Sequence, residues 1–246
     1  MYHFFVEPSQ IEEKKIRITG SDVNHIKNVL RMKPGEQICV SSGRENKEYF
    51  CEISSISQEE VCASILEVWK SERELESRIV LFQGLPKSDK MELIIQKAVE
   101  LGVSEIVPVS TARTVVKLDM KKEQSRLKRW NGISESAAKQ SGRLIIPKVT
   151  PVMSFQEALV CAADLDVKMI PYELAEGMEK TRTLMEKIVP GQSVGIFIGP
   201  EGGFEEKEIE KAMEFGVEPI TLGRRILRTE TAGLVTLAML VYNLER

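Results

Sequence analysis

The stretch Ser193-Val-Gly-Ile-Phe-Ile198, followed directly by Gly199-Pro-Glu-Gly-Gly-Phe204, carries the strongest structural signal in the chain. The first six residues form a short apolar run that is typical of a buried strand. In the glycine-rich turn the main chain can approach a ligand closely and adopt positive φ, and the helix start beyond it leaves N–H groups unsatisfied. A second bend, Leu222-Gly-Arg-Arg-Ile-Leu-Arg-Thr-Glu-Thr-Ala232, lies shortly downstream. We expect the two bends to form a site for a small polar ligand.

The sequence around these bends alternates between short apolar runs and longer amphipathic segments. Such alternation predicts an α/β fold, with a parallel sheet covered by helices on both faces. Ligands bind such sheets beyond the carboxyl ends of the strands, so the loops after residues 170, 198 and 222 are the candidates. The expected strands are 79–82, 106–109, 167–170, 194–198 and 219–222, and the expected helices are 89–101, 121–140, 155–163, 178–188, 205–215 and 229–244.

Residues 1–72 have a different pattern, with several short β-rich runs separated by turn residues and one helix. This pattern predicts a small β-barrel domain, followed by a charged linker and a second domain over 73–246. Ser21 or Thr19 is expected to cap the helix. Arg31, together with His25 and Lys27 on that helix, is a candidate for contact with a phosphate backbone, and a solvated helix face explains the same residues equally well.

Composition excludes several classes of protein. The 246 residues contain only two histidines, and the four cysteines show no metal-binding spacing, so we expect no metal and no disulfide. No apolar run is long enough to span a membrane, and the N-terminal residues lack the pattern of a signal peptide. A cytoplasmic protein is therefore expected.

The net charge of −3 conceals a basic segment. Between residues 111 and 148, ten lysines and arginines stand against three acidic residues, which gives a local charge of +7. Such asymmetry favours a polyanionic partner, although a solvated helix face is the alternative. The candidate RNA contacts here are Lys128, Arg129, Gln140 and Arg143, and Lys117 belongs to the same segment.

Common nucleotide-binding motifs are missing from the α/β part. No G-x-G-x-x-G motif follows its first strand, and Pro86 stands before Lys87-Ser88 where a P-loop requires glycine. Glu201 in the glycine-rich turn would repel a polyphosphate. These features favour a ligand that carries a cation or an amine, or one recognised through main-chain hydrogen bonds.

The bends Val194–Phe204 (VGIFIGPEGGF) and Leu222–Ala232 (LGRRILRTETA) resemble the cofactor loops of the SPOUT methyltransferases. More narrowly, they are similar to the bacterial ribosomal RNA small-subunit methyltransferase E family. Further blocks support that resemblance over essentially the whole chain: HIKNVLRMKPG at 25–35, QGLPKSDKME at 83–92, KAVELG at 97–102 and AKQSGR at 138–143.

The resemblance implies an N-terminal PUA-like β-barrel that binds RNA and a SPOUT catalytic domain with a C-terminal deep trefoil knot. It implies a homodimer that transfers methyl from S-adenosylmethionine to N3 of a uridine in 16S ribosomal RNA of the small subunit. The cofactor would bind residues of both bends and of the loop after residue 170: Leu174, Ile198, Gly199, Pro200, Gly202, Gly203, Leu222, Gly223, Ile226 and Leu227.

Methylation at uracil N3 requires loss of a weakly acidic proton, so a carboxylate base and a cation are expected nearby. Glu230 is the candidate base and Arg228 the candidate cation, with Glu201 as the other carboxylate. Alternatively, Glu230 only stabilises the start of the last helix, and Arg228 only pairs with it. Lys87 and Lys90 are candidate RNA contacts.

Two other functions remain open on the sequence alone. One is a non-catalytic RNA-binding or ribosome-assembly factor, and the other is a methyltransferase for another base or a ribose hydroxyl. Gly142 has a simpler reading as a helix terminator beside Arg143. The apolar stripe of the last helix predicts packing on the sheet, with a dimer contact as the alternative.

Overall fold

The computed structural model describes residues 1–116, 119–175 and 177–245, so Lys117 lies outside the described residues. The chain divides into two compact units. Unit 1 comprises residues 1–74 and 138–146, and unit 2 comprises residues 75–137 and 147–246. No helix among the described residues is long and apolar enough to cross a membrane.

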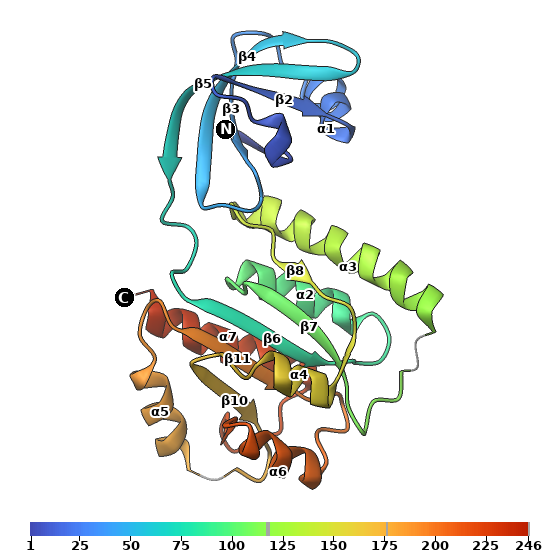
Figure 1. Cartoon of the computed structure of the whole chain (residues 1–246), viewed down its shortest axis with the longest axis vertical. Coiled ribbons are helices and arrows are strands. Elements are labelled where there is room, and N and C mark those ends of the chain that lie inside the picture. The colour runs from blue at the N-terminus through green and yellow to red at the C-terminus, as the bar shows by residue number, and fades with distance from the viewer. Residues whose placement is uncertain (117–118, 176, 246) are drawn as a thin grey trace. The chain divides into compact units, whose positions relative to one another are not determined.

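Unit 1 is built on a five-stranded sheet with the order β1-β3-β4-β5-β2 (Figure 1). β1 and β3 pair in parallel, and the other pairs are antiparallel. Two register shifts between β4 and β5 accompany the bending of the sheet around one apolar core that contains Ile16, Ile38 and Ile53. The strands are β1 (Tyr2–Phe5), β2 (Lys15–Thr19), β3 (Gln37–Ser41), β4 (Lys47–Ile56) and β5 (Glu60–Lys70).

The expected helix of unit 1 forms, but its predicted cap is wrong. Helix α1 (Ser21–Asn24) continues as a π turn (His25–Val29) and buries Val23 and Ile26. Its N-cap residue is Gly20, at φ 77°, because Thr19 still belongs to β2 and Ser21 is already helical. A short 3₁₀ turn (Pro8–Gln10) precedes β2.

Unit 2 contains a seven-stranded sheet in which every pairing is parallel, as the alternating pattern predicts. Its order is β12-β10-β11-β6-β7-β8, and β9 also pairs with β7. The short strands β8 and β9 were not anticipated. The strands are β6 (Arg78–Gly84), β7 (Glu105–Ser110), β8 (Lys148–Val149), β9 (Met153–Ser154), β10 (Val167–Pro171), β11 (Ser193–Ile198) and β12 (Glu218–Ile220).

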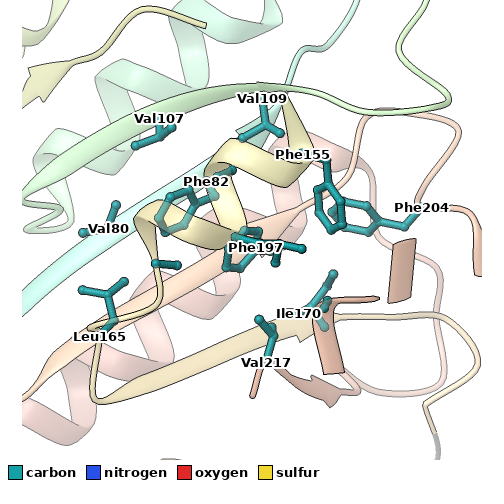
Figure 2. Close-up of a cluster of buried hydrophobic side chains, with 14 of the residues drawn as sticks. Val80, Phe82, Val107, Val109, Phe155, Leu165, Ile170, Phe197, Phe204 and Val217 are labelled. Atoms are coloured by element: carbon teal, nitrogen blue, oxygen red, sulfur yellow. The ribbon is translucent and has the colours of Figure 1, made fainter. Parts of the chain in front are cut away.

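Helices cover both faces of this sheet. Residues of α4 and α6 pack with Phe82 and Phe197 on one face, where the two rings stack with centroids 4.4 Å apart (Figure 2). α7 packs on the other face, where Gly233 lies against Leu81, and α2 packs against α7. The helices are α2 (Lys90–Glu100), α3 (Met120–Ser141), α4 (Phe155–Cys161), α5 (Met178–Lys187), α6 (Glu206–Glu214) and α7 (Thr229–Leu244). The trefoil knot stays a prediction.

Candidate functional site

A cavity of about 480 Å³ lies in unit 2 beyond the carboxyl ends of β10, β11 and β12. This volume falls within the range of roughly 300–1,000 Å³ that is usual for small-molecule sites. Both bends of the sequence line the cavity, and the loop after β10 forms a third side. The lining residues are Lys90, 171–173, 198–204, 221–229 and Ala232.

One buried hydroxyl joins the two bends. Thr229, the first residue of α7, donates a hydrogen bond from Oγ1 to the carbonyl oxygen of Gly199 at 2.6 Å. The same hydroxyl accepts a hydrogen bond from Nε2 of the fully buried Gln83 at 2.9 Å. Since Gln83 is the next-to-last residue of β6, this chain of hydrogen bonds fixes both bends to the sheet.

The glycine-rich turn approaches the sheet more closely than a side chain permits. A Cβ at Gly84 would lie 2.6 Å from the backbone nitrogen of Pro200. Within the turn, Gly203 adopts φ +68° and donates its N–H to the carbonyl of Pro200. Glycine at both positions lets this turn pack against the end of β6.

Three charged side chains meet beside the cavity, and of these Lys90 and Glu201 line it whereas Glu230 does not. The ammonium of Lys90 lies 3.0 Å from Oε1 of Glu201 and 3.4 Å from Oε2 of Glu230. The backbone N–H of Lys87 also donates to both carboxylate oxygens of Glu201, at 3.1 and 3.3 Å. Oε2 of Glu230, by contrast, is buried and accepts no hydrogen bond from the described residues.

The electrostatics of this cluster favour the charged forms of Lys90 and Glu201. The hydrogen bond to Glu201 raises the pKa of Lys90 above its usual value, and Glu230 adds to the effect. Burial by itself would raise the pKa of Glu201. Hydrogen bonds from its own backbone amide, from Lys90 and from the Lys87 amide outweigh burial and hold that pKa below its usual value.

Arginines occupy the rim of the cavity. Arg224, Arg225 and Arg228 line it and are exposed, and none forms an ion pair among the residues that the structure describes. The alternative in which Arg228 only pairs with Glu230 is therefore not seen, and Lys90 occupies the ion-pair position at Glu230 instead. Arg113, from the loop after β7, donates to the carbonyl of Gly202 at 2.9 Å and braces the turn from outside.

Nine of the ten expected cofactor residues line the cavity, namely Ile198, Gly199, Pro200, Gly202, Gly203, Leu222, Gly223, Ile226 and Leu227. Leu174 does not line it. Its side chain is 70% exposed, and the loop after β10 contributes Pro171, Tyr172 and Glu173 instead. Lys90, expected at an RNA surface, lines the cavity.

The expected RNA contacts are scattered over both units. Lys128, Gln140 and Arg31 are exposed. Arg129 is exposed and forms a 2.8 Å ion pair with Glu92. No group of side chains suitable for a metal occurs within residues 1–116, 119–175 and 177–245.

Arg143 does not fit the expected role of an RNA contact. Its side chain is buried and lies 2.6 Å from the equally buried carboxylate of Glu74. Gly142, at φ +71°, ends α3, and the Arg143 N–H returns to the carbonyl of Ala138, so the helix-terminator reading is the one seen. This geometry turns Arg143 inward to neutralise Glu74.

Comparisons with known proteins identify the family of this chain. Residues 73–241 match the family model described as an RNA methyltransferase domain, and residues 18–66 match an RNA methyltransferase PUA domain. The ribosomal RNA small subunit methyltransferase E of Bacillus subtilis (strain 168) is 40% identical over 253 residues, covering 100% of this chain and 98% of that protein. This chain belongs to the ribosomal RNA small subunit methyltransferase E family.

Other members of the methyltransferase E family confirm the assignment. The relative from Mesomycoplasma hyopneumoniae (strain 232) is 37% identical, with 96% of this chain and 97% of the relative covered. A crystal structure of the Neisseria gonorrhoeae member bound to S-adenosyl methionine superposes with a TM-score of 0.84 at 32% identity, covering 99% of this chain and 98% of that one. The SPOUT α/β fold and the PUA-like N-terminal sheet are thereby established for this chain.

Proposed function

We propose that this chain transfers a methyl group from S-adenosylmethionine to N3 of a uridine in 16S ribosomal RNA. Family membership supports methyl transfer to ribosomal RNA. The observation that carries the reaction is the carboxylate of Glu230, which directly follows the lining residue Thr229. Its Oε2 atom is buried, accepts no hydrogen bond from the described residues and lies 3.4 Å from the ammonium of Lys90.

The cavity suits this cofactor. Ile198, Leu222 and Leu227 supply apolar wall for an adenine, and the glycine-rich turn presents main-chain donors and acceptors. Glu201 is already paired with Lys90, so the carboxylate of Glu173 is the lining group that would interact with a positive charge on the ligand. S-adenosylmethionine carries a sulfonium and no phosphate, and its methyl carbon accepts the nitrogen lone pair while the C–S bond electrons return to sulfur.

Glu230 and Arg228 would perform the proton chemistry. Glu230 would take the N3 proton from the uracil ring, because its Oε2 accepts no hydrogen bond from the described residues. The Glu201 carboxylate, by contrast, already accepts a hydrogen bond from the Lys87 amide and pairs with Lys90. Arg228 would stabilise the negative charge that develops on the uracil oxygens. Holding base, ring and methyl group in line would supply much of the rate acceleration.

The substrate must present an unpaired base. N3 lies on the Watson–Crick edge of uracil, so the target nucleotide must be single-stranded or extruded from its helix. We assign RNA binding to residues 1–72 as a PUA-like domain, and catalysis to residues 73–246. Lys128 and Arg129 on α3, with Lys87, Gln140 and Arg31, would contribute backbone contacts to the small ribosomal subunit or its RNA.

The active form is proposed to be a cytoplasmic homodimer. α7 is apolar along most of its length, yet Tyr242 is 85% exposed and Ala238 is also exposed. A helix that is apolar on all sides is normally buried on all sides. A second copy of the chain would cover this face.

The decisive experiment is transfer of labelled methyl from S-adenosylmethionine to 16S ribosomal RNA and, separately, to assembled small subunits, followed by nucleoside analysis. We expect 3-methyluridine as the labelled product. Label on another base or on a ribose would contradict the proposed site of methylation. Cofactor and RNA binding without any label transfer would instead favour a non-catalytic assembly factor.

A further inference from the structure

Lys90 differs from Lys97, the other lysine of its helix, in the charged groups around its ammonium. It is the first residue of α2, and its side chain reaches the cavity between carboxylates from two other segments. Lys97, on the same helix, pairs only with its neighbour Glu100 at 2.8 Å on the surface. A lysine kept for contact with RNA phosphates would be expected to present its ammonium to solvent.

The carboxylates of Glu201 and Glu230 need the nearby cation of Lys90 if both are to be ionised. Glu201 comes from the turn after β11 and Glu230 from the first turn of α7. Like charges near one another in a partly buried site oppose ionisation of both groups. The ammonium of Lys90, within 3.4 Å of both, offsets that repulsion.

The two carboxylates are held unequally. Glu201 accepts from the Lys87 amide and has the shorter contact with Lys90, so it anchors the ammonium. Glu230 meets only that ammonium, at the longer distance, and its buried Oε2, the atom that faces Lys90, accepts no hydrogen bond from the described residues. Lys90 is thus fixed by one acid and orients the other.

We propose that Lys90 is a positioning residue for methyl transfer: its ammonium, anchored by Glu201, holds the negatively charged Glu230 side chain in place to accept the substrate proton. This inference rests on the proposed function. Lys90 itself neither gives nor takes a proton: the proton passes from uracil N3 to Glu230 and later to solvent. The other charged groups around the cavity are Glu173, Arg224, Arg225 and Arg228, and among the described residues only Lys90 lies within ion-pair distance of Glu230.

The test compares Lys90→Met, Lys90→Arg, Glu230→Gln and the double variant Lys90→Met/Glu230→Gln with the unsubstituted protein. For Lys90→Met we expect kcat to fall about tenfold or more, since a positioned base contributes at least that much. The KM for RNA and the Kd for S-adenosylmethionine should change by less than about threefold, because the lost interaction acts in the transition state. Lys90→Arg should recover most of kcat.

The double variant decides whether Lys90 acts through Glu230. If it does, the double variant loses no more activity than Glu230→Gln alone, whereas fully additive losses would overturn the inference. Lys97→Met, which removes a charge from the same helix, should leave kcat unchanged. A raised KM for RNA with normal kcat in Lys90→Met would instead make Lys90 an RNA contact and also overturn it.

Methyl transfer by the unsubstituted protein distinguishes a failure of this inference from a failure of the proposed function. Absence of methyl transfer by the unsubstituted protein, with 16S RNA and small subunits both supplied, would refute the proposed function and the inference together. Normal transfer by the unsubstituted protein and undiminished kcat in Lys90→Met would refute the inference alone. Should Lys90→Met fold poorly, Lys90→Gln keeps a polar side chain that is one atom shorter and removes the charge, and the same kcat loss is expected.

Discussion

At the scale of single residues, the hydroxyl of Thr229 joins the two bends that form the cavity. Its removal in Thr229→Val leaves the partly buried carbonyl of Gly199 without its donor. It also leaves the buried amide nitrogen of Gln83 with only its hydrogen bond to the Gly84 carbonyl. A buried polar group left unsatisfied costs about 1–3 kcal/mol. We expect the free energy of unfolding to fall by about that amount and the affinity for S-adenosylmethionine to fall with it, measured by denaturation and calorimetry. Thr231→Val, an exposed position in the same turn, should change neither.

Gly84 tests the close approach of the glycine-rich turn to the sheet. In Gly84→Ala the new methyl would meet backbone atoms of Pro200 and Gly199, which cannot rotate away as a side chain would. Overpacking of this kind costs typically about 1–3 kcal/mol. Gly132→Ala is the matched control, because a methyl there meets nothing within 4 Å. Thermal unfolding should show a loss for Gly84→Ala and a gain of up to about 1 kcal/mol for Gly132→Ala, since alanine favours a helix interior.

At the scale of elements, the start of α4 carries a capping box that depends on pH. Ser154 accepts the Glu157 N–H, and the Glu157 carboxylate accepts from the hydroxyl and N–H of Ser154, which lowers the pKa of Glu157 below its usual 4.5. A depressed folded pKa stabilises the fold above the unfolded-state value, and this contribution disappears as pH falls through the folded value.

The difference in unfolding free energy between the unsubstituted protein and Glu157→Gln should therefore be constant near neutral pH. The difference should shrink toward zero as pH falls below 4.5, because the Glu157 carboxylate becomes protonated and is then as uncharged as the glutamine that replaces it in the variant. Chemical denaturation across pH 3 to 7 (roughly the range of carboxylate titration) measures it. Glu186→Gln, an exposed glutamate of α5, serves as the reference. A gap that widens in acid would contradict the sign of the effect.

At the scale of the whole molecule, RNA binding is expected to release counterions from the phosphate backbone. Lys128 is exposed on the basic part of α3 and forms no ion pair within the described residues, whereas Arg129 is already paired with Glu92. Lys128→Gln should therefore make the plot of log affinity against log salt shallower by about one unit. Lys187→Gln, on α5, should leave the slope unchanged. If the two variants changed the slope equally, the effect would reflect the net charge of the protein and not a contact between α3 and RNA.

The dimer is tested on the exposed face of α7. Tyr242→Glu places a charge where a second copy would exclude water, so we expect light scattering to give twice the chain mass for the unsubstituted protein and the chain mass for the variant. Met213→Glu alters a side chain on α6 that is 56% exposed and should leave the dimer intact. A monomeric unsubstituted protein would refute the proposed assembly.

The sequence by itself determined the parallel α/β class, the loops that form the site and nine of its lining residues. These features follow from local signals: apolar runs such as 194–198 predict buried strands, and the glycines of 199–203 permit a tight turn wherever that turn lies. The error at the helix cap near Ser21 is also local, because β2 extends one residue further than the turn residues indicate.

Only the tertiary structure decided which charges meet. Lys90 reaches Glu201 and Glu230, and Thr229 reaches Gln83 across 146 positions of sequence, because strand order in the sheet brings their loops to one edge. Arg143 turned inward through another long-range contact, since its buried partner Glu74 lies 69 positions away. Long-range contacts of this kind have no local pattern, and a lysine or arginine that ends beside a buried carboxylate looks, in the sequence, like one that faces solvent.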